Sequence, residues 1–235
     1  MEFRDAIDLL VKYGNEQTKR IHMNHGAKEP LFGVKYGDIK KIYSRIKKDH
    51  ELSLKLYDTG NSDAMVLACL IADEKQITKE ILNRWIQKAY WYMLSEYSVA
   101  SVAAESLYGW ESGMEWIESD RENIASGGWA TLAWTISVLD NDKLDLNLIN
   151  DLMSVIQGEI HSARNRVRFT MNNFIIAVGS YIPDLAQEAM DIAVYNGKVK
   201  VDMGKTSCKV PYAPEYILKV ADRNRLGVKR KFARI

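Results

Sequence analysis

The stretch that decides the fold is KAYWYMLSEY, Lys88–Tyr97, which runs on into a further apolar segment without a Gly or Pro. At 100° per residue, Trp91 and Ser95 share one stripe of a helix. Three consecutive aromatics, Tyr90, Trp91 and Tyr92, cannot all face one core, so at least one is expected on the surface. An aromatic there is either covered by the next helix or used as a contact surface.

Around this stretch the chain alternates between helical periods and short breaks. Roughly a dozen helices with short connections are typical of an α-solenoid, an array in which each unit contacts its neighbours. We therefore predict an all-α, HEAT-like superhelix in one domain, 1–235, whose inner helices line a concave groove. The predicted units, near the length of HEAT-type repeats, are 63–89, 90–120, 121–163 and 164–198.

Three local patterns refine this prediction. Gly127–Gly128 is expected to interrupt the helices at that point, and Pro183 is expected to begin one. Residues 197–204 alternate in polarity, so they are expected to form an extended segment or a small hairpin.

Composition places few constraints on function but excludes several classes. No apolar run approaches the ~20 residues that span a bilayer, and the charged N-terminus lacks a signal-peptide core. Cys69 and Cys208 lack metal-site or disulfide spacing, and the four His residues lack metal-ligand spacing. We expect a cytoplasmic protein with no metal and no cofactor.

The net charge of +1 hides a strong segregation along the chain. Residues 1–48 hold 11 Lys/Arg against 6 Asp/Glu, and residues 198–235 hold 11 against 3. Residues 49–160 hold 7 against 19. Two basic ends and an acidic middle indicate a polyanion bound by selected faces, although charge runs are also typical of a solvated surface. The groove is accordingly expected to be basic.

The first candidate contacts for a polyanion lie near the N-terminus. Asp38 is a plausible N-cap for a helix over 39–48, in which Lys40, Lys41 and Arg45 surround an apolar stripe. These three cations are predicted to bind phosphate.

A second cluster is Arg164, Arg166 and Arg168. Arg164 and Arg168 share one helix face, and two guanidinium groups one turn apart suit successive phosphates. The alternative is a basic patch at a helix start with no ligand.

Several short motifs follow one another along most of the chain, and their order and spacing are informative. They are His22–Gly26 (HMNHG), Phe32–Val34 (FGV), the basic helix 38–48, Asn61–Ala64 (NSDA) and Lys88–Trp91 (KAYW). Together they resemble the AlkD-like DNA alkylation repair family, HEAT-like repeat proteins of about this size. Its known glycosylases cut the N-glycosidic bond of N3- and N7-alkylpurines without drawing the base into a pocket, unlike base-flipping enzymes.

The resemblance also shows where this chain departs from active members. In those a Trp is followed one turn later by an Asp, which stabilises the positive charge that develops on the sugar. Trp91 matches the Trp, but Ser95 stands at the Asp position and is neutral. Glu96 could substitute only if the backbone shifts. The family's DNA-holding Arg falls on Leu132, and its second Trp falls near Phe174.

The basic tract 198–235 resembles an extension found in one subgroup of the family. We predict a monomeric protein that binds duplex or branched DNA through Trp91, Phe174 and the two basic clusters, with Ser95 marking a lost catalytic site. Two alternatives remain open. One is an active alkylpurine glycosylase that uses Glu96, and the other is a helical scaffold that holds protein partners.

Overall fold

The structure is a computed structural model, and it describes residues 1–234. Within them the chain forms thirteen α-helices, one π-helix and two short 3₁₀ turns, with no β-strand. The prediction of an all-α fold is confirmed. The elements are α1 Phe3–Tyr13, α2 Glu16–Asn24, α3 Tyr36–Ile46, α4 His50–Asp58, α5 Ser62–Ile71, α6 Lys79–Lys88, η1 Met93–Val99, α7 Ala100–Glu105, α8 Gly109–Ile117, α9 Glu122–Val138, η2 Asn141–Lys143, α10 Leu146–Glu159, α11 Asn165–Tyr181, η3 Pro183–Leu185, α12 Ala186–Asn196 and α13 Ala213–Asp222.

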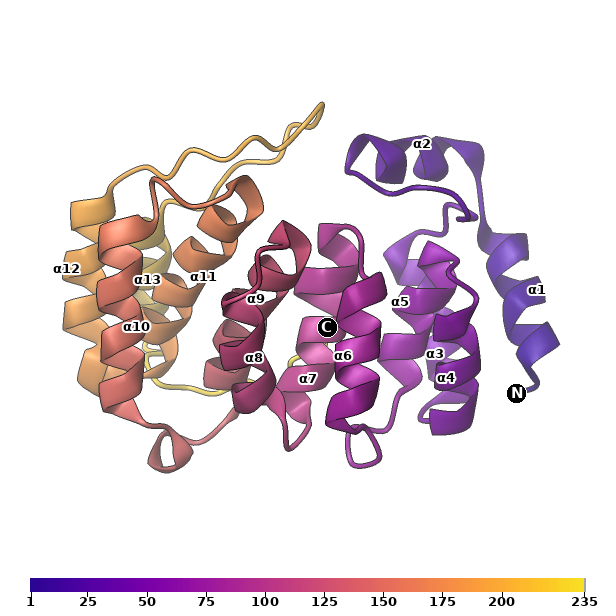
Figure 1. Ribbon diagram of the computed structural model, residues 1–235, viewed down its shortest axis with the longest axis horizontal. Coiled ribbons are helices and arrows are strands. Elements are labelled where there is room, and N and C mark those ends of the chain that lie inside the picture. The colour runs from indigo at the N-terminus through magenta and orange to yellow at the C-terminus, as the bar shows by residue number, and fades with distance from the viewer. Residues whose placement is uncertain (235) are drawn as a thin grey trace.

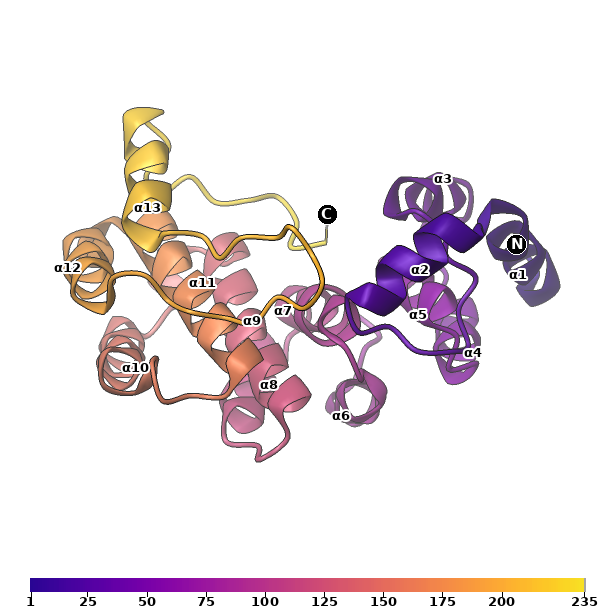
Figure 2. The same cartoon turned by 90° about the horizontal axis from the view of Figure 1, so that it is seen from above.

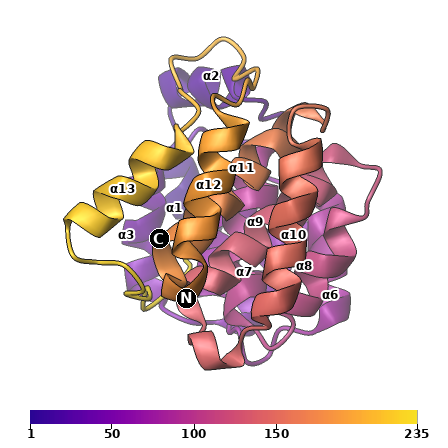
Figure 3. The same ribbon diagram turned by 90° about the vertical axis from the view of Figure 1, so that its left-hand side faces the viewer.

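The helices stack in two layers (Figure 1). An outer layer contains α4, α6, α8 and α10, and an inner layer contains α5, α7, α9 and α11. Seen from above, α13 and α3 both lie on the side of the inner layer that is turned away from the outer layer, one towards each end of the molecule (Figure 2). The end-on view places α12 between α10 and α13 (Figure 3). We call the side between α13 and α3 the inner face.

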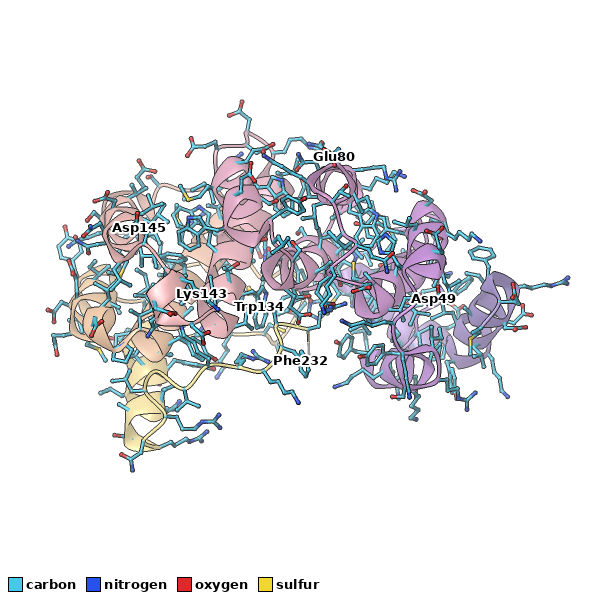
Figure 4. All side chains as sticks on the ribbon, turned by 90° about the horizontal axis from the view of Figure 1, so that it is seen from below. Asp49, Glu80, Trp134, Lys143, Asp145 and Phe232 are labelled. Atoms are coloured by element: carbon cyan, nitrogen blue, oxygen red, sulfur yellow. The ribbon has the colours of Figure 1, made fainter. Side chains whose placement is uncertain are left out.

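Side-chain caps explain where several helices begin. Asp49 accepts a hydrogen bond from the Leu52 N–H at the start of α4, and Asp145 does the same for the first turn of α10. Figure 4, the view from below, shows Asp49, Glu80 and Asp145 near the starts of α4, α6 and α10, spread along the length of the molecule. The expected cap at Asp38 is wrong, because α3 begins at Tyr36 and Asp38 lies in its first turn.

The expected break at Gly127–Gly128 is also wrong. Helix α9 continues through both glycines because it packs unusually close to α8. A Cβ on Gly128 would lie 2.6 Å from the Ile117 backbone nitrogen and 2.9 Å from the Gly113 carbonyl oxygen. The glycines therefore allow helix contact, and their cost in helix propensity is offset by that packing.

The apolar core forms two clusters that meet near the start of α9. One extends from Ala6 to Ile124 and the other from Ala125 to Ile217. Among the described helices, none has the length and apolar character needed to cross a bilayer.

The chain after α12 leaves the helical layers twice. Residues 197–212 run as an extended segment along the edge of α11 towards α2 and back to α13, without strand pairing (Figure 1). Residues 223–234, which we call the tail, then cross the inner face from α13 towards α5 (Figures 2 and 4). These two segments reshape the inner face.

Candidate functional site

The inner face contains two adjoining hollows. The first, of about 280 Å³, is lined by α5 and η1 and includes Tyr36, Cys69 and Tyr97. The second, of about 340 Å³, lies between α9, α11 and α13 and includes Tyr97, Trp134 and Tyr216. Tyr97 borders both, so the two hollows lie on either side of this side chain. We call them the α5 hollow and the α9 hollow.

The tail places one arginine in each hollow. Arg230 borders the α9 hollow, where its guanidinium lies 5.0 Å from the Trp134 ring centre. Arg234 borders the α5 hollow and pairs with Glu105 and Glu74, both at 2.6 Å. Its guanidinium also donates to the Ala72 carbonyl at 2.6 Å. The tail is therefore tied to the inner layer by a buried cation.

Lys229 anchors the same segment to the end of α9. Its Nζ donates to the Ile136 carbonyl at 2.7 Å, while the neighbouring Arg230 N–H donates to the Ser137 carbonyl at 2.8 Å. Burial lowers the pKa of Lys229 to about 8, and the charge of Asp140 partly opposes this shift.

Trp91 is not on the surface, so its expected exposure in the groove is wrong. Its side chain is 6% exposed, and the indole N–H donates to Ser62 Oγ at 3.0 Å. The His22 ring lies 5.9 Å from it. The start of α5, through Ser62, and α2, through His22, flank the indole, and Trp91 belongs to the first apolar cluster.

Ser95 is fully buried, and its hydroxyl donates back to the Trp91 carbonyl at 3.3 Å. Immediately around it the backbone forms the π-helix η1, in which an extra residue per turn changes which side chains face inwards. Glu96 lies in the same π-helix and borders the α9 hollow.

The Glu96 carboxylate is nevertheless occupied. Arg166 Nε donates to one of its oxygens at 2.9 Å, and the Arg166 Nη2 binds the other. The guanidinium also lies between two rings, 4.7 Å from the Tyr92 centre and 4.3 Å from the Phe169 centre. Burial raises the pKa of Glu96, and the ion pair with Arg166 opposes that rise. The nearest carboxylate to the family's Asp position is thus neutralised by a fixed cation.

The arginine cluster does not form one phosphate-binding face. Arg164 binds the Ser119 and Asp120 carbonyls at the turn between α8 and α9. Arg166 points instead into the ion pair with Glu96, and Arg168 borders the extended segment 197–212. The prediction of a shared face for Arg164 and Arg168 is wrong because each guanidinium has a separate environment.

Phe174 and Leu132 are also core residues. Phe174 is fully buried and packs edge-on against Trp129 with ring centres 5.4 Å apart, so a direct contact with a ligand is excluded. Leu132 is fully buried and packs against Gly113 of α8, where a Cβ would lie 2.6 Å from its Cδ2. Neither side chain can hold a DNA backbone.

The α3 cations are exposed, as expected. Lys41 pairs with Asp38 at 2.7 Å, and Arg45 has no ion pair among the described residues. Lys40 lies 5.9 Å from the ring centre of Tyr36, which borders the α5 hollow. Lys40 therefore lies beside a residue of that hollow but does not line it.

The sequence did not reveal the role of Asp63. Its buried carboxylate accepts the backbone N–H groups of Phe32, Gly33 and Val34 at 2.6, 3.0 and 3.1 Å. It thereby fixes the loop between α2 and α3 against α5. The NSDA motif could have suggested this, since an Asp after an N-capping Asn is well placed to bind a neighbouring loop.

Comparison with known proteins assigns the family. A family model described as DNA alkylation repair enzyme matches residues 6–217. The chain belongs to the DNA alkylation repair family. Two uncharacterised Listeria proteins are similar: Lmo0209 of Listeria monocytogenes is 36% identical, with 90% of this chain and 93% of that protein covered. Lin0241 of Listeria innocua is 35% identical, with 89% and 92% covered.

One solved structure shares the whole architecture of this family member. It is 37% identical, covers 99% of both chains and superposes with a TM-score of 0.89. That structure represents "a new family of proteins related to the HEAT-like repeat DNA glycosylases with affinity for branched DNA structures". The predicted HEAT-like fold is confirmed. Among the described residues, no three His, Cys, Asp or Glu side chains are grouped as metal ligands.

Proposed function

We propose that this protein binds branched DNA along its inner face and does not excise alkylated bases. The observation that carries the binding is the similarity over 99% of the chain to a protein with affinity for branched DNA. Arg230 borders the α9 hollow without an ion pair among the described residues, and the exposed Lys231 follows it, which supports the same surface. Cations there would contact phosphates, which dominate the affinity of proteins for DNA.

The absence of excision is supported by the chemistry at η1. Base departure leaves positive charge on the sugar, so a catalyst needs a fixed, unneutralised negative charge beside it. Ser95 carries no charge and is sealed in the core. Glu96 borders the α9 hollow, but Arg166 already neutralises it. This arrangement disfavours the alternative of a glycosylase that uses Glu96.

We also propose that 1–235 acts as one array, as a monomer in the cytoplasm. A single chain supplies both hollows, and the free thiols Cys69 and Cys208 suit a reducing compartment.

The binding proposal is tested by fluorescence anisotropy with a four-way junction and a linear duplex of equal length. Arg230→Glu/Lys231→Glu should weaken binding to both at least tenfold. Lys55→Glu/Lys75→Glu, two exposed sites on α4 and on the turn between α5 and α6, is the matched control and should have little effect. If the two double variants lose DNA affinity equally, the inner face is not the binding surface. A wild-type protein that binds neither DNA would refute the proposal.

A further inference from the structure

A third hollow lies outside the inner face, between the two legs of the extended segment 197–212. It has a volume of about 650 Å³. Lys198 and Lys200 border it from the outgoing leg and Lys209 from the returning leg, while α11 contributes Asn165 and Arg168. We call it the leg pocket.

Helix α11 fixes both legs, so the leg pocket is a built feature. The Asn165 side chain accepts the Asp202 N–H at 2.7 Å and donates to the Asp202 carbonyl at 2.8 Å. Further along the same helix, Asn172 Nδ2 donates to the Pro211 carbonyl at 3.0 Å. Val199 packs into the apolar cluster beneath and is 7% exposed. The outgoing leg is therefore held at Asn165 and the returning leg at Asn172, at two separate points of one helix.

The leg pocket is strongly cationic. Four cations border it against one carboxylate, that of Asp202, which also accepts the Gly204 N–H. Among the described residues, the side chains of the three lysines make no ion pair or hydrogen bond. The Nε of Arg168 is buried without a partner. A guanidinium donor without an acceptor is costly, and Arg168 makes no ion pair among the described residues, so its charge is available to an anion in the pocket that it borders.

We propose that the leg pocket binds backbone phosphates of a second DNA arm. This rests on the proposed function, since it assumes that a first arm lies on the inner face. Pro211 borders both the leg pocket and the α9 hollow, so the returning leg is a thin wall between two phosphate-binding surfaces.

Two surfaces on opposite sides of a wall favour a branched ligand. Arms that diverge at a branch can lie one on each side, whereas a straight duplex follows one side. Engaging the second arm is then an intramolecular step, which raises affinity for the junction without new contacts to the first arm. The phosphates in the pocket position the arm and carry no sequence information.

The test compares Lys198→Gln/Lys200→Gln/Lys209→Gln with a control triple, Lys12→Gln/Lys55→Gln/Lys75→Gln. All six lysines are exposed, and the control set lies on α1, α4 and the turn between α5 and α6. Anisotropy is measured for a four-way junction and for a linear duplex over a range of salt concentrations, and the melting temperature confirms that each variant is folded.

We expect the leg-pocket triple to bind the junction about tenfold or more weakly. Its log–log salt slope should be less steep by roughly two to three, at ~0.9 per lost phosphate contact, and its duplex affinity should stay close to wild type. The control triple should match wild type on both DNAs. Equal weakening on junction and duplex would overturn the assignment to a second arm, as would a leg-pocket triple that behaves like the control.

A second measurement does not depend on DNA binding. Titration of the full chain with inorganic pyrophosphate, followed by backbone amide NMR shifts, should perturb residues 165–168 and 198–211. The leg-pocket triple should lose these shifts. If wild type shows no such shifts, the anion site is wrong even if junction binding persists. If the shifts appear but wild type binds no DNA, the site takes free phosphate, and both the second-arm proposal and the proposed function fall.

Discussion

Glu96 and Arg166 form a buried, two-pronged ion pair that joins η1 to α11. Removing one partner of such a pair leaves the other charge buried, which costs about 3–5 kcal/mol. We expect this loss for Glu96→Gln and for Arg166→Gln in urea unfolding. The double variant should recover a substantial part of it, because neither charge is then left alone. Additive losses in the double variant would show that the two residues are not coupled.

Trp91 provides a second test at this scale. Because the indole is enclosed and its N–H is satisfied by Ser62, Trp91→Ala should lower the free energy of unfolding by about 3–5 kcal/mol. Tyr195→Ala, at a side chain that is 72% exposed, should change it by less than ~0.5 kcal/mol. Unchanged stability in Trp91→Ala, together with lost DNA affinity, would restore the reading of Trp91 as a surface contact.

The sequence indicated that the stretch around Trp91 is central to the fold, but it did not predict which of its side chains are buried. Helical spacing separates Ser95 from Glu96 by 100°, and it cannot predict a π-helix that begins at Met93. The environment of Trp91 depends on Ser62, 29 residues earlier in the chain, to which its indole N–H donates. The exposure of Lys40 and Arg45 was predictable, because one amphipathic helix decides it.

At the scale of elements, the tail is held on the inner face by Arg234. Arg234 pairs with Glu74 and Glu105 and caps the end of α5 through the Ala72 carbonyl. Arg234→Ala should therefore lower the free energy of unfolding by about 3–5 kcal/mol, since two partly buried carboxylates lose their partner. Lys231→Ala, at an exposed site of the same tail, should be nearly neutral. Equal stability of the two variants would mean that the tail is not docked on the inner face.

Lys229 gives the tail a pH dependence of defined sign. Its pKa is about 8 in the folded protein against 10.5 for an ordinary lysine, so the unfolded chain binds more protons between those values. Wild-type stability should accordingly rise, relative to Lys229→Met, as the pH increases from about 8 towards 10.5. The rise should be modest because the side chain is half-exposed. Melting temperatures of both proteins measure it, and a difference that falls over this range would contradict the assignment.

The periodicity of the sequence predicted where most helices lie, but it did not predict which helices and segments contact one another. It predicted the order of helices, the start at Pro183 and the extended residues 197–204. It failed at Gly127–Gly128, because the reason for those glycines lies in the approach of α8. The path of the tail across the inner face depends on pairs such as Arg234 with Glu105, far apart in sequence, which no local pattern reveals.

In the whole molecule, a hollowed inner face lies beside Ser95, which is buried at the position where the resemblance places the family's Asp. The fold was predictable because each repeat buries its apolar face on the next, which leaves a periodic pattern in the sequence. The site was predictable only in part: the change at Ser95 was visible, whereas the neutralisation of Glu96 depends on a pair 70 residues apart.

The most direct test uses a four-way junction that carries N7-methylguanine near its branch point, with excess protein. Binding is followed by anisotropy, and base release is followed in the same sample under single-turnover conditions. We predict tighter binding than to the matched linear duplex, with no release above the uncatalysed rate for wild type or for Ser95→Asp. Rapid wild-type release would contradict the central claim, and its collapse in Glu96→Gln, measured at a temperature where that variant is still folded, would assign the release to Glu96.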